Sequence, residues 1–535
     1  MTIDEVSQLD RDISTALTTV RELKNSLALI NRIPLDILSL IPTHLNSQND
    51  IFRASFVCRN WRRAFLQHGA LWSTLFVGKG GDYVTTLLER AKGSALHIIV
   101  DYQVPLETIT LLSPHAQKIR HLEFPSGCWG DVLMFARVNS QPLPLLRTLE
   151  IYTTRDNKHH SQSDMLATPS LPLFGGCVNL VELGLDLDEE QIKMLDHFSF
   201  PNLTTFVLSV FPTRSLDASH LLDFLKASPT LRTVDVRVYG CIKPGGIPRD
   251  TVVALPNVET FCLYNLDDAC NVYESAIHIS CPRAKYTSLT QEIPNYRRTR
   301  DLGIFPDTTS WERIVRQYTR SPIKEVTLEI DGGPPNNITC SLIFQSSDNT
   351  VIKLRFEALH DDAEGLELSY EEMNLKVFSQ ACRTIQGLPL LSHVKRFRFK
   401  DGTGTLSAGN VPPMAYLIGG LFKSLGPLDE LIIHGCDLQI FLPPFIGPCE
   451  FWPSEQVFPH VQWLTISEAL IEQQCMDAIV NLAKLQHELE KPFECVTICA
   501  RGIPPAMAER LGQWVNAVDC HEPSSMVCGS MPLIV

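Results

Sequence analysis

Apolar side chains recur at alternating spacings of three and four along residues 1–31. The series comprises Val6, Leu9, Ile13, Ala16, Val20, Leu23, Leu27 and Ile30, with Asp, Arg, Lys and Ser among the residues between them. This spacing forms the seam of a heptad and predicts an amphipathic helix. A seam this short favours packing of the helix on the rest of its own chain, and self-association with a second copy is the alternative.

Residues 32–78 predict a compact set of helices. Within IPLDILSLIPTHL, from Ile33 to Leu45, the apolar residues share one helical face. The next segment, NSQND, is rich in turn-forming residues, and Asp50 is the expected N-cap of the following helix, with Gly69 just beyond its end. The apolar face of that helix comprises Ala54, Val57, Cys58, Trp61 and Phe65, and its solvated face carries Arg59 and Arg63.

Residues 79–535 carry a loose repeat of the pattern Pro-x-Leu-x-x-Leu-x-Leu. The closest copies are PLLRTLEI (144–151), PNLTTFVL (201–208), PTLRTVDV (229–236), PNVETFCL (256–263) and PHVQWLTI (459–466). With looser copies included, the first apolar residues of the predicted short strands fall at 122, 149, 183, 206, 234, 261, 326, 354, 397, 431, 464 and 496. Many of these steps lie between 23 and 34 residues, close to the period of a leucine-rich repeat.

This repeat predicts an α/β fold. Short strands that each bury two alternating apolar side chains stack in parallel, and the segments between them return as helices or loops. The expected architecture is a leucine-rich-repeat-like solenoid with a curved parallel sheet, preceded by a small all-α module and an N-terminal helix. The long steps from 261 to 326 and from 354 to 397 indicate degenerate units or inserted loops. One insert, His360 to Glu372, is strongly acidic, which predicts a solvated segment or, alternatively, a contact with a basic partner.

The overall charge disfavours nucleic acid as a partner. The chain has 46 Lys and Arg against 60 Asp and Glu, a formal charge of −14, and a surface of this sign repels phosphate backbones. No apolar run approaches the roughly 20 residues that span a bilayer, so no membrane partner is expected. The polar start MTIDEVSQLDRDIS differs from a secretory signal, and the 16 scattered cysteines include no C-x-x-C pair. We therefore expect reduced thiols and a location in the cytoplasm, the nucleus or both.

The motifs indicate binding rather than catalysis. VGKGGD, from Val77 to Asp82, lacks both the Ser or Thr after the lysine and the earlier glycine of a phosphate-binding loop. Neither G-x-S-x-G nor H-E-x-x-H occurs in the sequence. Cys520, His521 and Cys528 lack a fourth ligand at a spacing suited to tetrahedral zinc. We expect no enzymatic activity, no cofactor and no bound metal, and an enzyme site assembled from distant residues is the weaker alternative.

Residues 33–72 resemble an F-box, a family whose usual pattern runs Leu-Pro-x-Glu-Ile/Leu-Leu, then Val-Cys-x-x-Trp, then Leu-Trp. Ile33-Pro34 correspond to the opening pair, Asp36 replaces the glutamate, Ile37-Leu38 match the apolar pair, Val57-Cys58-Arg59-Asn60-Trp61 match the central signature, and Leu71-Trp72 match the closing pair. The order of heptad helix, F-box and irregular leucine-rich repeats is similar to that of the large F-box families of mushroom-forming fungi.

The resemblance implies a substrate-receptor subunit of an SCF-type cullin-RING ubiquitin ligase. In that family the F-box binds a Skp-type adaptor, which joins it to a cullin, and the repeats hold a protein substrate. Such a receptor performs no bond chemistry and acts by raising the effective concentration of substrate near the charged ubiquitin carrier. By resemblance, the adaptor face or its support comprises Pro34, Leu35, Leu38, Ile41, Leu45, Val57, Cys58, Trp61 and Trp72. Of these, Trp61 is expected in the core, because it lies on the apolar face of its helix.

Pro42 departs from the F-box pattern, which usually has an aromatic or aliphatic residue at this position. Proline removes a backbone donor and clashes one turn back, so the first helix is expected to kink or break near Ile41. The departure leaves an alternative function, a leucine-rich-repeat scaffold that binds a partner and has a degenerate F-box without a ligase role.

Overall fold

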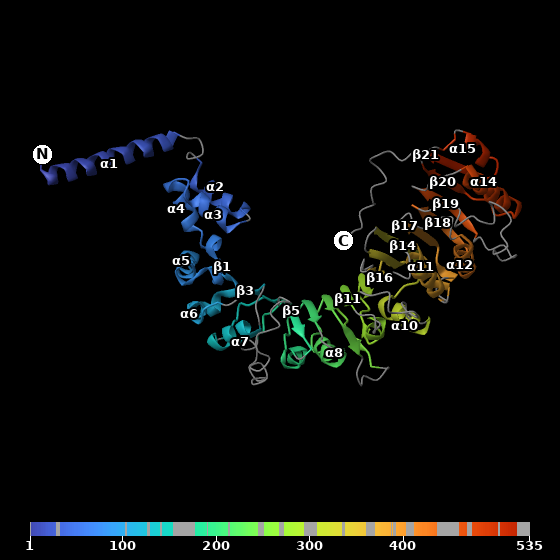
Figure 1. Ribbon diagram of the computed structural model, residues 1–535, viewed down its shortest axis with the longest axis horizontal. Helices are drawn as coiled ribbons and strands as arrows, with labels where there is room; N and C mark the ends of the chain where they lie inside the picture. Colours follow the sequence, from blue (N-terminus) through green and yellow to red (C-terminus); the bar gives the residue numbers. More distant parts are fainter. Residues whose placement is uncertain are drawn as a thin grey trace. The chain divides into compact units, whose positions relative to one another are not determined.

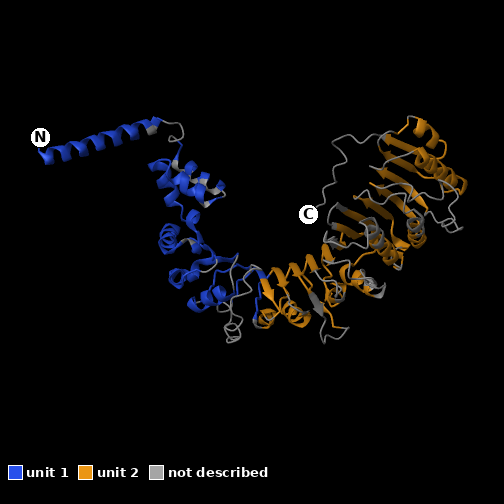
Figure 2. Ribbon diagram, in the orientation of Figure 1, with its two compact units in different colours: residues 1–185, 198–203 blue, residues 186–197, 204–535 orange. Residues whose placement is uncertain are grey.

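The chain divides into two compact units in the computed structural model (Figure 2), residues 1–185 with 198–203 and residues 186–197 with 204–535. The predicted division at residues 31 and 78 stays a prediction. The structure describes residues 2–27, 33–45, 47–101, 104–125, 129–139, 142–152, 177–189, 191–211, 215–243, 251–266, 272–293, 308–333, 337–359, 370–386, 388, 392–402, 411–435, 460–467, 473–500, 503–504 and 506–521. Most of the acidic insert His360 to Glu372, and Cys528, lie outside the described residues.

The predicted N-terminal helix is present as α1 (Ile3–Leu27). The side chains of its seam are exposed, from 48% for Val6 to 65% for Leu23. The expectation that this helix packs on the rest of its own chain is therefore wrong. Away from the seam, Glu22 forms an ion pair with Arg59, and an exposed pair of this kind contributes little to stability.

The predicted helical module follows α1 in the first unit. It contains α2 (Leu35–Leu40), η2 (Ile41–His44), α3 (Gln48–Ser55), α4 (Arg59–Gln67) and η3 (Gly69–Trp72). Ser47, and not the expected Asp50, caps α3, because the Ser47 hydroxyl accepts the Asp50 N–H at 3.1 Å. The single helix expected after the turn is two helices, since the chain leaves α3 at Phe56 and re-enters a helix at Arg59.

The first unit continues with a parallel sheet. Its strands, in spatial order, are β1 (Thr74–Phe76), β2 (Leu96–Ile99), β3 (Ile119–Phe124), β4 (Thr148–Ile151) and β5 (Glu182–Asp188), of which β5 belongs to this unit as far as Leu185. The connecting segments include η4 (Val77–Lys79), α5 (Gly81–Ala91), α6 (Leu106–Thr110), η5 (Ser113–Lys118) and α7 (Trp129–Val138). Phe124 of β3 packs edge-on against Phe135 of α7 at 5.8 Å between ring centroids, so strand and helix share one core.

The second unit has a longer, mostly parallel sheet. Its strands, in spatial order, are β6 (Thr205–Phe211), β8 (Thr233–Val238), β11 (Thr260–Leu266), β13 (Tyr286–Ile293), β16 (Val351–Leu359), β15 (Asn337–Ser346), β14 (Ile323–Gly333), β17 (Arg396–Asp401), β18 (Leu428–His434), β19 (Val461–Ser467), β20 (Cys495–Cys499) and β21 (Ala517–His521). Two small parallel pairs are separate from this sheet, β7 (Ser215–Asp217) with β9 (Cys241–Lys243) and β10 (Val253–Ala254) with β12 (Ile279–Ser280).

The helices of the described residues lie against one face of this sheet, and none of them covers the other, which we call the uncovered face (Figure 1). They are η9 (Gln191–His197), α8 (Ala218–Lys226), α9 (Val272–Ala276), α10 (Thr308–Tyr318), α11 (Tyr370–Gln386), α12 (Val411–Ser424), α14 (Gln473–Glu488) and α15 (Ala506–Leu511). Aromatic rings join strand to helix, as Phe206 does with Phe224 at 4.6 Å between ring centroids. The arrangement is consistent with a solenoid.

Each residue predicted to start a repeat strand is a buried strand residue. Adjacent copies are also in register, as Leu122 is with Leu149, and Phe397 with Leu431. The Pro-x-Leu element is a tight turn before the strand, in which the Leu203 N–H donates to the Phe200 carbonyl at 3.1 Å. Asparagine side chains tie neighbouring turns together, as the Asn257 amide does by donating to the Pro229 carbonyl at 3.0 Å.

The long step from 261 to 326 contains strands that the repeat pattern missed. β13 lies within this step, and Val326 and Leu354, expected on neighbouring parallel strands, lie on either side of the antiparallel strand β15. Only residues 347–350 separate β15 from β16, and so short a connection permits an antiparallel pair but not a parallel one, which needs a crossover of a dozen or more residues. The expectation of an entirely parallel sheet is therefore wrong at this point.

Candidate functional site

Two tryptophans form the interior of the helical module. Trp61 of α4 is 7% exposed, as its place on the apolar face predicts, and its ring stacks on Phe65 at 5.8 Å between centroids. Trp72 of η3 is fully buried, and its indole N–H donates a 2.9 Å hydrogen bond to the Phe65 carbonyl. Trp72 therefore joins η3 to α4, and neither tryptophan lies on a free surface.

The module is joined closely to α5, the first helix after it. The Arg90 guanidinium of α5 lies 4.6 Å from the Trp72 ring centroid, and Phe52 of α3 packs edge-on against the same ring at 5.1 Å. Gly69 permits this approach, because a Cβ at that position would lie 2.4 Å from the Ala91 carbonyl oxygen. The module is thus positioned by a packed contact within the first unit.

Apolar side chains of the module also face solvent. On α2, Leu38 is buried, whereas Ile37 and Leu40 are 47% and 56% exposed. Ile37 and Leu40 are three residues apart and lie on one helical face, roughly 100° and 160° around the helix from Leu38. In the turn between α3 and α4, Phe56 and Val57 are 66% and 52% exposed. These four residues are accessible apolar positions outside the core of the module.

The structure separates the residues assigned by resemblance into buried and accessible ones. Leu38, Trp61 and Trp72 are buried, Pro34 and Val57 are exposed, Ile41, Leu45 and Cys58 are half-buried, and the Leu35 side chain lies outside the described residues. The buried side chains support the module and have no surface with which to contact a partner. Ile37, Leu40 and Phe56 were missed as surface residues, although the three-residue spacing of Ile37 and Leu40 was visible in the sequence.

Pro42 interrupts the first helix as predicted. The α-helical hydrogen bonding ends at Leu40, and residues Ile41–His44 form one turn of 3₁₀-helix. Proline cannot donate to the carbonyl one turn earlier, so the tighter turn replaces the missing α-helical turn.

The arginines of α4 lie on its solvent side, as its amphipathic pattern predicts. Arg59, Arg62 and Arg63 are exposed, and with Lys92 they line a shallow depression on the surface. The Arg62 guanidinium lies 4.9 Å from the Phe56 ring centroid, which holds that exposed ring beside a cation. The depression is basic, in contrast to the acidic chain as a whole.

Comparison with protein families shows which family model the helical module matches. Residues 30–78 match the family model described as F-box-like. The chain carries an F-box-like domain. Comparison of the sequence with curated proteins gives no match. The F-box-like domain covers the segment from the α1–α2 connection to η4 and includes both the buried tryptophans and the exposed apolar residues of α2.

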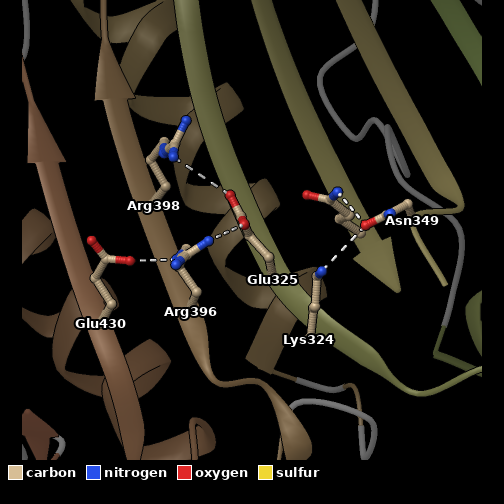
Figure 3. A network of polar contacts seen from close by, with 7 residues as sticks. Lys324, Glu325, Asn349, Arg396, Arg398 and Glu430 are labelled. Atoms are coloured by element: carbon tan, nitrogen blue, oxygen red, sulfur yellow. Dashed lines mark hydrogen bonds and ion pairs between the residues drawn. The ribbon is translucent and has the colours of Figure 1, made fainter. Parts of the chain in front are cut away.

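The uncovered sheet face of the second unit is a second candidate surface, and it is rich in charge. Arg396 of β17 lies between two carboxylates, 3.2 Å from Glu325 of β14 and paired with Glu430 of β18 (Figure 3). Arg398 pairs with Glu325 at 3.7 Å, and Lys400 pairs with Glu329 at 2.6 Å. The cations of this network are neutralised by carboxylates of neighbouring strands.

Other kinds of site find no support in the part of the chain that the structure describes. No described helix is long and apolar enough to cross a membrane, and no described group of three or more His, Cys, Asp or Glu side chains could hold a metal. Burial raises the pKa of the Cys177 and Cys340 thiols to about 12, so both remain protonated at neutral pH. These cysteines act as small apolar side chains of the core.

Proposed function

We propose that the chain is a substrate-receptor subunit of an SCF-type ubiquitin ligase. The observation that carries the proposal is the F-box-like domain at residues 30–78, because F-box domains generally bind Skp-type adaptors. The adaptor would join the chain to a cullin, and the repeats would hold a protein substrate. The protein then acts by proximity and not as an enzyme, with no cofactor, and works in the cytoplasm, the nucleus or both.

The exposed apolar residues of the F-box-like domain are the proposed adaptor surface. Ile37 and Leu40 lie on one face of α2, and Val57 lies in the turn before α4. Side chains that bury apolar area on binding must be accessible beforehand, which these are and which Leu38 and Trp72 are not. The buried residues of the resemblance would then support the surface.

We further propose that the repeat region is an irregular leucine-rich-repeat solenoid, similar to that of the large F-box families of mushroom-forming fungi. Its support is the parallel sheet with in-register buried strand residues and helices on one face. A solenoid with one uncovered sheet face offers a long surface for a protein partner.

A scaffold without a ligase role is the second candidate function. The observation that favours it is the end of α2 at Leu40, because the 3₁₀ turn at Pro42 shortens the helix that carries Ile37 and Leu40. In that case the repeats would bind a partner, and the F-box-like domain would have lost its adaptor.

Copurification with an adaptor distinguishes the two functions. The tagged full chain would be coexpressed with a Skp-type adaptor and a cullin, beside the double variant I37D/L40D and the control L106D. Leu106 of α6 is 50% exposed, so L106D introduces the same charge on an apolar surface residue of the same unit. We expect the wild type and L106D to recover adaptor and cullin and I37D/L40D to recover neither. Equal recovery by both variants would contradict the assigned surface, and a wild type that captures another protein but no adaptor at micromolar concentration would support the scaffold.

Self-association through α1 is also proposed. The seam of α1 is exposed in the single chain, and a folded protein rarely leaves an apolar stripe of this length in water. β-branched residues at alternate seam positions (Val6, Ile13 and Val20) are typical of two-stranded coiled coils. A second copy of α1 is therefore the proposed occupant of the seam.

A further inference from the structure

Aromatic side chains form a row on the uncovered sheet face of the second unit. Phe211 of β6 stacks on Tyr239, which follows β8, with ring centroids 4.5 Å apart and ring planes 9° apart. The Tyr239 ring lies 6.0 Å from that of Tyr264 on β11. The alternate residues of these strands are buried on the helix side, so the three half-exposed rings belong to the opposite face. Three adjacent parallel strands thus present an aromatic row at their carboxyl ends.

Two carboxylates continue this row on the next two strands. Leu266 at the end of β11 is in register with Glu292 of β13, which is in register with Glu357 of β16. The Glu357 carboxylate lies 2.5 Å from Nε of Arg355, without the alignment of a hydrogen bond. Among the described residues, no hydrogen bond or ion pair holds the Glu292 carboxylate. Arg355 acts on Glu292 from a distance, and Lys353 of β16 is close enough to Glu357 for their charges to interact. Burial and, to a lesser extent, the charge of Glu357 raise the pKa of Glu292 to about 7, and Arg355 opposes this shift.

We propose that this aromatic–acidic strip, which comprises Phe211, Tyr239, Tyr264, Glu292 and Glu357, binds an arginine side chain from an extended basic segment of a protein substrate. The inference rests on the proposed role of the second unit in holding a substrate. Arginine is the side chain that both stacks on aromatic faces and pairs with a carboxylate through two parallel hydrogen bonds. A guanidinium bound in the strip would give Glu292 an ion pair, which it lacks among the described residues, while Glu357 keeps its pair with Arg355.

Charge on the rest of the face directs an arginine to this strip. On β14, β17 and β18 the carboxylates already have partners, as Glu325 has in Arg396 and Glu329 has in Lys400. At the other end, Arg237 already holds Asp235 at 2.8 Å. The strip itself contains two carboxylates and no cation, and its nearest cations are Arg355 and Lys353 of β16, so it favours a basic segment over an acidic one.

Peptide binding to the purified full chain tests the proposal. The probes are fluorescent nine-residue peptide libraries with random flanks and a fixed central Arg, Lys or Glu, measured by fluorescence anisotropy. We expect the Arg library to bind at least ten-fold more tightly than the Glu library, with the Lys library between them. Y239L and E292Q should each weaken binding of the Arg library about ten-fold. E292R should reverse the preference toward the Glu library, and this gain of binding cannot come from misfolding.

Two control variants make the test specific. W463L removes an exposed ring from β19 outside the strip, and I37D/L40D changes the F-box-like domain, so both should bind the Arg library as the wild type does. Equal binding of the Arg and Glu libraries, equal binding of the Arg and Lys libraries, or an equal loss in W463L and Y239L would overturn the proposal. Y239L and E292Q should recover the adaptor as the wild type does. Peptide binding therefore tests the strip, and adaptor recovery tests the ligase role independently.

Discussion

The indole N–H of Trp72 donates a hydrogen bond of 2.9 Å to the backbone carbonyl of Phe65, and both side chains are fully buried. The bond joins the last turns of α4 to η3, where the helices of the F-box-like domain meet the first strand. Because the Trp72 side chain is fully buried, its indole N–H cannot replace this hydrogen bond with one to water. The closing tryptophan of the F-box pattern is thus a structural residue in this chain.

The variant W72F tests this structural role. It keeps an aromatic ring but removes the donor, so the Phe65 carbonyl keeps only its hydrogen bond from the His68 N–H, and the loss should cost about 0.5–1.5 kcal/mol of local stability. Hydrogen-exchange mass spectrometry should then show faster exchange in peptides from α4 and β1. W463F, at a Trp that is 43% exposed in the second unit, should leave exchange in these peptides unchanged. Exchange in W72F equal to the wild type would show that the hydrogen bond does not stabilise the domain.

Gly69 is expected to be essential for the contact between the F-box-like domain and α5. In G69A the new Cβ would lie 2.4 Å from the Ala91 carbonyl oxygen, a backbone atom that cannot rotate away. Forced separation of η3 from α5 should lower stability by about 1–3 kcal/mol and reduce adaptor recovery. G81A is the matched control, because its Cβ would meet only the Leu111 side chain at 3.5 Å. The midpoint of thermal unfolding checks both variants, and equal midpoints would contradict the prediction.

The ion-pair network around Arg396 should contribute more to the stability of the second unit than an exposed ion pair on the same unit does. Arg396 contacts both Glu325, which is 8% exposed, and Glu430. R396M would leave the sheltered Glu325 without its nearer cation and should lower stability by about 1–3 kcal/mol. K285M breaks the pair of Lys285 with the exposed Glu259 and should have no measurable effect. Urea unfolding of both variants measures the difference, and equal loss or no loss in both would refute it.

The exposed seam of α1 predicts a concentration-dependent dimer. Sedimentation equilibrium of the full chain should show dimer in the wild type and monomer in I13D/V20D, because two charges in the seam cannot be buried unpaired between helices. T18D places one charge on the polar side of α1 and should still dimerise. A wild type that stays monomeric at tens of micromolar would contradict the proposed self-association.

Strand positions could be predicted from sequence wherever a strand buries apolar residues at every second position. Phe397 and Val496 are examples, since each starts such an alternation and each is fully buried. β13 escaped prediction because its buried side includes Thr287 and Gln291, which are polar. Tertiary contacts satisfy this polarity in part, as the Gln291 side chain accepts the Val272 N–H at 2.9 Å. A polar residue held by a distant backbone donor leaves no periodic signal.

The sequence was sufficient to identify the F-box-like domain but not to predict which of its side chains are exposed. The Val-Cys-x-x-Trp order located the F-box-like domain, yet Val57 was assigned to an apolar helix face that the turn at Phe56 interrupts. That turn forms because the Phe56 N–H donates to the Arg53 carbonyl at 3.0 Å, which closes α3 without any glycine or proline to mark its end. The partners of Arg396 could not be predicted, because Glu325 lies 71 residues away on a strand placed out of chain order.

Glu292 should make the second unit less stable as the pH rises. Its pKa is raised from 4.5 to about 7 by burial and by Glu357, with Arg355 opposing the shift. Between pH 4.5 and 7 the folded state therefore holds more protons than the unfolded state, so stability falls with rising pH through this window and the full loss is present above pH 7. E292Q removes this loss. Its thermal midpoint should exceed that of the wild type at pH 8, and the difference should shrink as the pH is lowered to 5.

The control for this pH dependence is E259Q. Glu259 is an exposed carboxylate whose pKa is lowered by Lys285, so it is charged in both states throughout the range from pH 5 to 8. The difference between E259Q and the wild type should therefore stay constant over this range. Parallel pH curves for E292Q and the wild type would show that Glu292 ionises as an ordinary surface carboxylate. The sheltered carboxylate that the arginine-binding strip requires would then be absent.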